Sequence, residues 1–143
     1  MVNSMEETMR PFDVQGIVLN TASERAFEFI PAPEQLPRWT QAFASAGGGR
    51  ARMRKPAGEV EIELTVQASA EQGTVDWLMR FPDGSIATAF SRVVPLSARR
   101  CAYCFVLTPL PVPLEQLEGA LEEQSRTLAA ELLRLQKILD QHG

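Results

Sequence analysis

The chain has two cysteines, and their spacing in Cys101-Ala102-Tyr103-Cys104 is that of dithiol redox centres and zinc half-sites. A redox dithiol needs a helix N-terminus, which lowers the thiol pKa, and a zinc half-site usually needs a tight turn. The surrounding segment RCAYCFVLT is typical of a strand instead. Because residues three apart in a strand point to opposite faces, we expect the two sulfurs to diverge. This prediction moves the interest to Tyr103, between them.

Few other residues could transfer protons or hold a cofactor. The single histidine, His142, lies next to the end of a predicted helix, which leaves a Ser-His or Cys-His pair without a candidate. The adjacent carboxylates Glu6 and Glu7, and Glu122 and Glu123, are typical of solvated charges. The glycine run 47–49 lacks the Lys-Ser/Thr of a phosphate loop. We therefore predict no metal ion and no cofactor, and we assign no catalytic residue.

Length and composition restrict the class of protein. With 143 residues, 45% of them hydrophobic, the chain fits one globular domain, which we place at residues 11–143 after a flexible N-terminus at 1–10. A net charge of -4 argues against nucleic acid as a partner. No apolar run approaches the roughly 20 residues of a membrane span, and the first residues lack the apolar region of a signal peptide. We expect a cytoplasmic protein without stable membrane insertion.

The spacing of apolar residues predicts the elements in chain order. PFDVQGIVLN has the content of a strand, and NTASERAFEFI and PAPEQLPRW follow as two short helices, the first opening with a capping box of Thr21 and Glu24. From residue 41 to 108, six apolar segments separated by turn sequences predict an antiparallel meander. Leucines at three- and four-residue steps from Leu114 to Leu139 predict one long amphipathic helix.

Turn sequences predict the register of neighbouring strands, and the register decides what each face carries. A four-residue KPAG loop gives the pairs Arg54 with Glu59, Arg52 with Glu61, and Arg50 with Glu63. This interpretation makes the RARMRK segment a self-neutralised, solvated face rather than a nucleic-acid patch.

Three further loops complete the predicted sheet: one after Ala68, a two-residue Asp83-Gly84 turn, and a four-residue PLSA loop. The expected pairs are Val66 with Val75, Leu64 with Trp77, Trp77 with Phe90, Val75 with Arg92, and Phe90 with Tyr103. The opposite face then carries mostly small residues, Leu78, Ala87, Ala89, Val93, Ala102, Cys104 and Val106. That face indicates partial coverage or a homodimer contact. A one-residue slip in the PLSA loop would turn the last strand over.

The order of strand, two short helices, six strands and a long helix resembles the helix-grip fold of the START-related superfamily, which includes polyketide cyclases and birch-pollen-allergen-like proteins. The likeness rests on TASERAFEFIPAPEQLPRW, GEVEIELTV, GTVDWLMRFPDG and FSRVVPLSARRCAYCFVL, and it covers about residues 12 to 140. The resemblance implies an α+β fold, in which a curved seven-stranded antiparallel sheet wraps around the C-terminal helix. It also implies a cavity between them for an apolar molecule.

The residues alone lead to a compatible picture, because the apolar sheet face must be covered and only the helix at 114–140 has a long enough apolar stripe. Bulky stripe positions are missing at Gly119, Ala120, Gln124 and Ser125, so we expect the cavity there. The predicted cavity residues are Ile62, Leu64, Trp77, Met79, Thr88, Phe90, Arg92, Tyr103, Phe105, Leu117, Leu121, Gln124, Ser125 and Leu128.

An inward Arg92 would need a carboxylate, a wet cavity mouth or an anionic ligand. We favour a carrier or sensor of a small hydrophobic molecule, since no proton-transfer group with an obvious partner occurs among the predicted cavity residues. The alternative is an enzyme resembling polyketide cyclases or dehydrases, in which Arg92 and Tyr103 polarise a carbonyl. A protein-binding module that docks partners on the outer sheet face is a third hypothesis.

Overall fold

The computed structural model describes residues 12–55, 58–108 and 117–140, which form one seven-stranded antiparallel sheet with the strand order β1-β7-β6-β5-β4-β3-β2. The strands are β1 (Asp13–Leu19), β2 (Phe43–Gly47), β3 (Arg50–Lys55), β4 (Gly58–Ser69), β5 (Thr74–Arg80), β6 (Ile86–Ser97) and β7 (Arg100–Leu107). The helical elements are α2 (Ser23–Phe29), the 3-10 turn η1 (Pro33–Gln35), α3 (Leu36–Trp39) and α4 (Leu117–Asp140). The predicted α+β architecture is confirmed. The predictions for residues 1–10, Leu114 and His142 lie outside the described residues.

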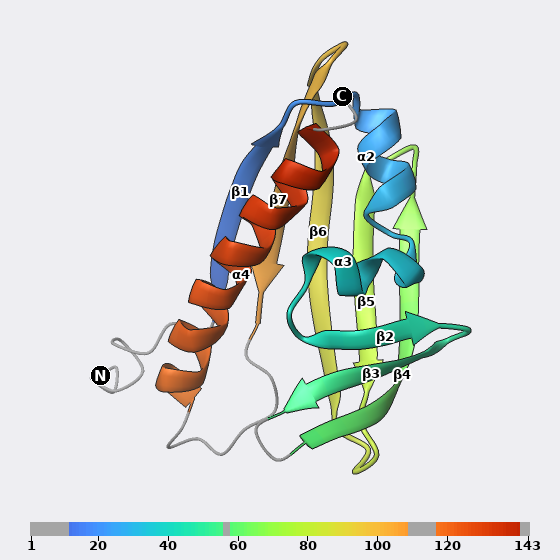
Figure 1. Cartoon of the computed structure of the whole chain (residues 1–143), viewed down its shortest axis with the longest axis vertical. Coiled ribbons are helices and arrows are strands. Elements are labelled where there is room, and N and C mark those ends of the chain that lie inside the picture. Colours follow the sequence, from blue (N-terminus) through green and yellow to red (C-terminus); the bar gives the residue numbers. More distant parts are fainter. Residues whose placement is uncertain (1–11, 56–57, 109–116, 141–143) are drawn as a thin grey trace, which may run out of the picture.

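The sheet is strongly twisted and is covered on one face by helices. In Figure 1, α4 runs across the sheet in front of β1 and β7, and α3 crosses in front of β5. Strands β2 and β3 run across the same view, whereas β5 and β6 run along it. Within the described part of the chain, no helix is long and apolar enough to cross a membrane.

Helix α4 buries its leucine stripe and is tied to β1 by hydrogen bonds. Leu128, Leu132, Leu135 and Leu139 are all buried, as their three- and four-residue spacing predicts. The hydrogen bonds include Gln15 Nε2 to the Ser125 carbonyl (2.8 Å), Gln136 Nε2 to the Val18 carbonyl (2.8 Å) and, just after β1, the Asn20 N–H to Asp140 Oδ1 (3.1 Å). These contacts fix the height of α4 over the sheet and thereby the space beneath its N-terminal half.

The predicted capping box of Thr21 and Glu24 is wrong. Helix α2 has Ala22 as its N-cap residue, and no side chain caps its first turn. Thr21 is buried where the chain leaves β1, one residue too early for its hydroxyl to reach the free N–H groups of the helix.

The predicted register between β3 and β4 is confirmed, with Arg54 opposite Glu59, Arg52 opposite Glu61, and Arg50 opposite Glu63. The ion pairs form on the diagonal instead, Arg50 with Glu61 and Arg52 with Glu59, both at 3.9 Å. All four side chains are about half exposed or more, so these pairs add little stability.

The predicted register between β4 and β5 is wrong by two residues, because β4 continues to Ser69. Val66 lies opposite Trp77, and Leu64 lies opposite Met79. The turn is closed by a hydrogen bond from the Gly73 N–H to the Ser69 carbonyl at 2.7 Å. A shift of two residues keeps every side chain on its predicted face.

The predicted register between β5 and β6 is wrong by one residue, and this error turns β6 over. The turn has three residues, with the Phe81 N–H bonded to the Ser85 carbonyl and Gly84 in a left-handed conformation at a φ of 88°. Trp77 therefore lies opposite Ala89 instead of Phe90. The residues that face inward are Ala87, Ala89, Ser91 and Val93, and those that face outward are Thr88, Phe90, Arg92 and Val94.

The predicted register between β6 and β7 is wrong by three residues. A bulge lies between Pro95 and Ser97, and Ser97 pairs with Arg100 across a two-residue turn. Tyr103 therefore lies opposite Val93 on the inner face, instead of opposite Phe90. The shift of one residue at the first turn and the shift of three residues at the second each reverse the face, so together they leave β7 in its predicted orientation. Cys101, Tyr103 and Phe105 are buried on the inner face as predicted. The predicted row of Trp77, Phe90 and Tyr103 does not exist.

The outer face carries larger apolar side chains than predicted. The small residues Ala87 and Ala89, and Val93, lie on the inner face instead, and the large exposed side chains of the outer face include Val14, Ile86, Phe90 and Val94. The homodimer contact on this face stays a prediction.

Candidate functional site

A cavity of about 420 Å³ lies between the sheet and the N-terminal half of α4. The sheet contributes Met53, Trp77, Met79, Ala89 and Phe105 to its wall. Helix α3 contributes Leu36 and Trp39, β2 contributes its first residue, Phe43, and α4 contributes Gln124, Leu128 and Glu131. Pockets of roughly 300–1,000 Å³ with apolar walls and a few polar groups are typical of small-molecule sites.

The cavity exists because small side chains meet at the centre of the sheet. Ala89 of β6 lies opposite Trp77 of β5, and Ala87 lies opposite Met79, so β6 forms a low floor between bulkier neighbours. Aromatic rings form the walls around it. Trp77 stacks on Phe105 with ring centroids 5.7 Å apart, and Tyr103 packs edge-on against both Phe105 and Trp39 at 6.3 Å.

Glu131 places a carboxyl group inside this apolar wall. It is 9% exposed, and its Oε2 accepts the backbone N–H of Gln41 at 2.5 Å, on the segment between α3 and β2. Burial raises the pKa of Glu131, and the backbone N–H groups of Gln41 and Ala42 oppose that rise. A buried carboxyl with a perturbed pKa in a cavity is a candidate functional group.

The cavity region also contains buried polar atoms without hydrogen bonds. In the described part of the chain, Trp39 Nε1, Trp77 Nε1, Gln124 Oε1, Ser125 Oγ and the Tyr103 hydroxyl have no partner of good geometry. Most buried polar groups in proteins are paired, so a cluster of orphans beside one cavity is informative.

Tyr103 and Cys101 are buried in neutral form. Burial raises the pKa of Tyr103 well above its usual range; the Ser91 hydroxyl lowers it, and the charges of Asp76 and Glu131 add to the rise. Burial, and next the charge of Glu24, raises the pKa of the Cys101 thiol, which makes it a poor nucleophile. Both cysteines are free, and both lie in β7 as predicted, with Cys101 facing inward. Within the described residues, no group of three or more His, Cys, Asp or Glu could hold a metal ion.

The exposed residues of the cavity wall mark its mouth. Arg54 and Glu123 line the cavity and are exposed. The Arg54 guanidinium donates to the carbonyls of Gln41 (3.0 Å) and Phe43 (3.4 Å), so its hydrogen-bonding capacity is partly used.

The structure brings some of the predicted cavity residues together. Those that line the cavity are Trp77, Met79, Phe105, Gln124 and Leu128. Ile62, Leu64 and Tyr103 are buried on the same face but belong to the core around the cavity. Ser125 lies beside the cavity, and its backbone carbonyl accepts a hydrogen bond from Gln15 Nε2.

Other predicted residues lie elsewhere. Thr88, Phe90 and Arg92 are on the outer face, because β6 is turned over relative to the prediction. Arg92 donates there from Nε to the Gln72 carbonyl at 3.2 Å, so it needs no internal carboxylate and cannot act beside Tyr103. The side chains of Leu117 and Leu121 lie outside the described part of the chain.

Glu131 and Trp39 were not among the predicted cavity residues. The signal for Glu131 is its spacing, three residues after Leu128 and four before Leu135, which places it on the buried side of α4.

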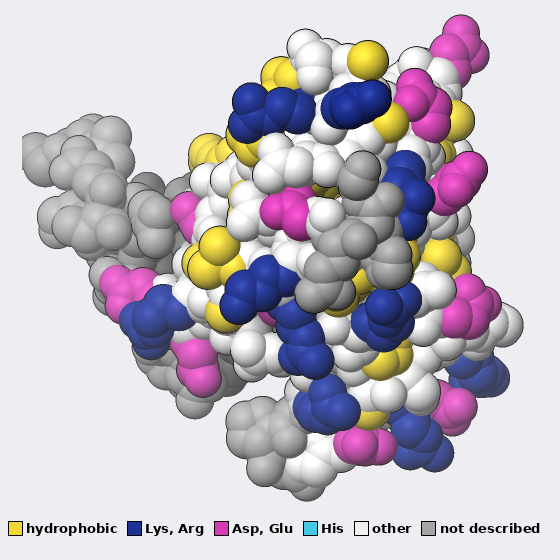
Figure 2. All heavy atoms as spheres, turned by 45° about the horizontal axis from the view of Figure 1, so that its top comes forward, with side chains coloured by type: hydrophobic (Ala, Val, Ile, Leu, Met, Phe, Trp, Pro, Cys, Tyr) yellow, Lys and Arg dark blue, Asp and Glu magenta, His cyan; other side chains and the backbone are white. Residues whose placement is uncertain are grey.

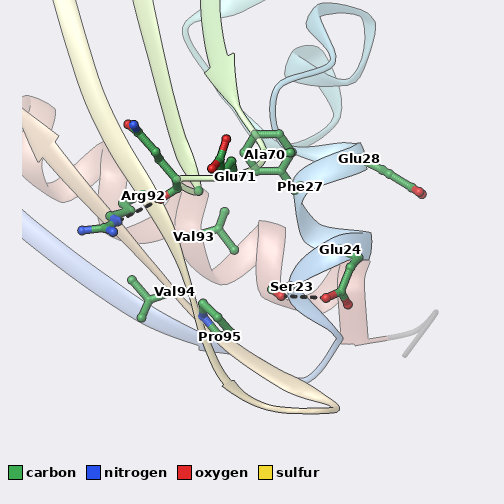
Figure 3. Close-up of a pocket in the computed structure, with 12 residues that line it drawn as sticks. Ser23, Glu24, Phe27, Glu28, Ala70, Glu71, Arg92, Val93, Val94 and Pro95 are labelled. Atoms are coloured by element: carbon green, nitrogen blue, oxygen red, sulfur yellow. Dashed lines mark hydrogen bonds between the residues drawn. The ribbon is translucent and has the colours of Figure 1, made fainter.

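A second hollow, of about 540 Å³, lies between α2, the turn after β4 and the end of β6 (Figure 3). Its acidic residues Glu24, Glu28 and Glu71 are exposed, and in Figure 3 the Arg92 side chain points away from Glu24 and Glu28. All its charged groups reach water, so this hollow is the weaker candidate. On the face shown in Figure 2, several Lys and Arg side chains lie near the middle, and most of the Asp and Glu side chains lie toward the edges.

No protein-family model matches the sequence, and no curated protein matches it. Among solved structures, an aromatase/cyclase from a Streptomyces species superposes with a TM-score of 0.68 at 9% identity, over 90% of this chain and 93% of that chain. A START superfamily protein from Mycobacterium smegmatis gives a TM-score of 0.63 at 14% identity, over 92% and 99% of the two chains.

A third similar structure is the Aha1 dimer from Colwellia psychrerythraea, with a TM-score of 0.60 at 16% identity, over 90% of this chain and 96% of that chain. Identities this low show a shared fold and leave function open. The chain therefore has the helix-grip fold of START-related proteins, a curved seven-stranded sheet around a long C-terminal helix.

Proposed function

We propose that the protein binds a small, mostly apolar molecule in the cavity between the sheet and α4, as a carrier or sensor. The observation that carries this proposal is a cavity of about 420 Å³ with aromatic and Met walls and one buried carboxyl group. Three orphaned polar atoms of the lining residues, Trp39 Nε1, Trp77 Nε1 and Gln124 Oε1, support the same function, since a ligand could supply their partners. We also propose the cytoplasm as the location, which fits the two free thiols.

A cavity-filling variant with a matched control tests this proposal. Ala89→Phe places a ring into the cavity floor, whereas Thr88→Phe adds the same ring to the outer face one residue earlier. With naphthylethanol as a fluorescent probe, we expect Ala89→Phe to raise the Kd at least about tenfold and Thr88→Phe to leave it within about twofold. Equal Kd values in both variants would place the binding outside the cavity.

An enzyme resembling cyclases is a second candidate, and the buried carboxyl of Glu131 is the observation that favours it. The pair of Arg92 and Tyr103 cannot serve this function, because the two side chains lie on opposite faces of the sheet. Mass spectrometry of ligands recovered from the protein separates the two candidates. A carrier returns its ligand unchanged, whereas an enzyme returns a product.

A further inference from the structure

Among the residues that the structure describes, Glu131 has no cationic partner. The ion pairs in the described part of the chain join Arg50 to Glu61, Arg52 to Glu59, and Arg80 to Glu63, and none involves Glu131. A carboxylate has about four lone-pair sites, and the backbone N–H of Gln41 donates to one of them on Oε2. Further acceptor sites remain for a ligand that enters the cavity.

We propose that the cavity binds a protonated amine with an apolar body, whose ammonium group donates hydrogen bonds to the carboxylate of Glu131. This inference rests on the proposed function, because it names the polar group of the ligand bound in the same cavity.

The aromatic residues of the cavity favour a cation. Trp39, Trp77 and Phe105 line the same space as Glu131. The negative faces of aromatic rings attract ammonium groups, and this attraction strengthens where water is excluded. An ammonium group on Glu131 would therefore be stabilised by a full charge and by ring faces, and the apolar body of the ligand would fill the remaining volume.

The charged and titratable groups around Glu131 also favour a cation over an anion. On α4 itself, Glu123 adds a second carboxylate at the mouth. From β7, Tyr103 is buried and neutral. Arg54 from β3 is the one cation among the described lining residues, and the Gln41 and Phe43 carbonyls already hold it.

Preorganisation explains why an amine should bind more tightly than an alcohol of the same shape. Folding has already removed water from the Glu131 carboxyl, and this desolvation raises its pKa. A bound ammonium group restores the stabilisation that the ionised form has lost, because it pairs a full positive charge with the carboxylate where water is excluded. An alcohol donates one hydrogen bond to the same carboxylate but brings no charge to pair with it.

A series of probes with one apolar body and different polar groups tests the inference. We would measure the Kd of naphthylethylamine, naphthylethanol and naphthylpropanoic acid by fluorescence at about pH 8, where the amine is protonated. On the wild-type protein, we expect the amine to bind at least about tenfold more tightly than the alcohol, and the acid to bind most weakly. If the alcohol or the acid binds as tightly as the amine, the inference is wrong and the proposed function stands.

The variant Glu131→Gln keeps the size and the oxygen acceptor but removes the charge. We expect the amine and the alcohol to bind within about threefold of each other on this variant, and the alcohol to keep its wild-type affinity within about threefold. Glu122→Gln, on the exposed side of α4, is the matched control and should keep the preference for the amine. A preference that survives in Glu131→Gln would overturn the assignment to this residue.

Two further outcomes keep the test decisive. If Glu131→Gln does not fold, titration of the wild-type protein to acidic pH replaces it: protonation of Glu131 should abolish the preference for the amine and leave the alcohol unaffected. A preference that is unchanged at acidic pH would count against the inference. If none of the three probes binds to the folded wild-type protein, the proposed function itself fails.

Discussion

Glu131 is the charged residue that the described part of the chain buries in the cavity wall, and its place on α4 is unusual for a carboxylate. Leu128 and Leu135 are buried on the same side of the helix, so the glutamate is carried into the core by the leucine stripe. The sequence contains this signal in the helical spacing. The sequence does not reveal the hydrogen-bond donors of Glu131. The N–H groups of Gln41 and Ala42 lie near its carboxyl group only because of the direction that the chain takes after α3.

The raised pKa of Glu131 predicts a pH dependence of folding stability. The unfolded chain has the ordinary pKa of 4.5, so between that value and the folded-state pKa the folded chain binds more protons. Stability therefore falls as the pH rises through this window, and the ionised group is unfavourable at neutral pH. We expect Glu131→Gln to be more stable than the wild type at about pH 7.5 by on the order of 1 kcal/mol, and to lose this advantage toward about pH 4.

Urea unfolding at both pH values measures this difference, with Glu122→Gln as the control for an exposed carboxylate. The control should change the free energy of unfolding by less than about 0.5 kcal/mol at either pH. A Glu131→Gln variant that is less stable than the wild type mainly at neutral pH would show that the fold needs the ionised carboxylate, contrary to the raised pKa.

At the scale of elements, turns decide which side chains reach the cavity. Asp83-Gly84 favours a two-residue hairpin turn, but Pro82 before it suits the first central position of a type I turn, followed by a left-handed Gly84. A two-residue turn would pair Pro82 with Ser85, although proline has no N–H for the ladder. This conflict could have been recognised in the sequence.

The bulge after Pro95 could not be placed from the sequence in the same way, because Pro95, Ser97 and Ala98 are all turn-forming or small residues and several turn positions are compatible with them. Strand content and alternation were predictable from local spacing. The inward set of β6 depended on the Asp83-Gly84 turn alone, so Ala89 was missed. Tyr103 was placed correctly because the error in the next turn cancelled the first one.

The turn between β4 and β5 has a requirement for glycine that can be tested. Gly73 has a φ of 76°, and a Cβ atom there would lie within 2.4 Å of the Val93 carbonyl oxygen. The Gly73 carbonyl also accepts the Val93 N–H at 2.8 Å, so the turn is fixed to β6. We expect Gly73→Ala to lower the free energy of unfolding by about 2 kcal/mol or more, as measured by urea denaturation.

Gly48→Ala separates the two causes of this loss. Gly48 has a similar φ of 63°, but a Cβ atom there would meet nothing within 4 Å. We expect it to cost only the backbone strain of about 1 kcal/mol. If both variants lose the same free energy of unfolding, the clash with Val93 contributes nothing to the requirement for glycine at position 73.

At the scale of the whole molecule, the cavity is a property of the assembled sheet and helix. The leucine stripe and the alternating strands predicted a one-faced sheet under a long helix, and the superpositions on START-related structures share that arrangement. The exact floor and walls follow from the register of the strands that line the cavity and from the height of α4 on β1, which hydrogen bonds such as Gln136 to Val18 fix. No local pattern in the sequence contains that information.

The most direct test of the central claim uses the methionine methyl groups. Met53 and Met79 line the cavity, whereas the other three of the five methionines precede residue 12. On protein labelled with ¹³C at the methionine methyl groups, we expect naphthylethanol to shift the NMR signals of Met53 and Met79 in proportion to its binding curve. Saturable binding that leaves both signals in place would contradict a ligand site between the sheet and α4.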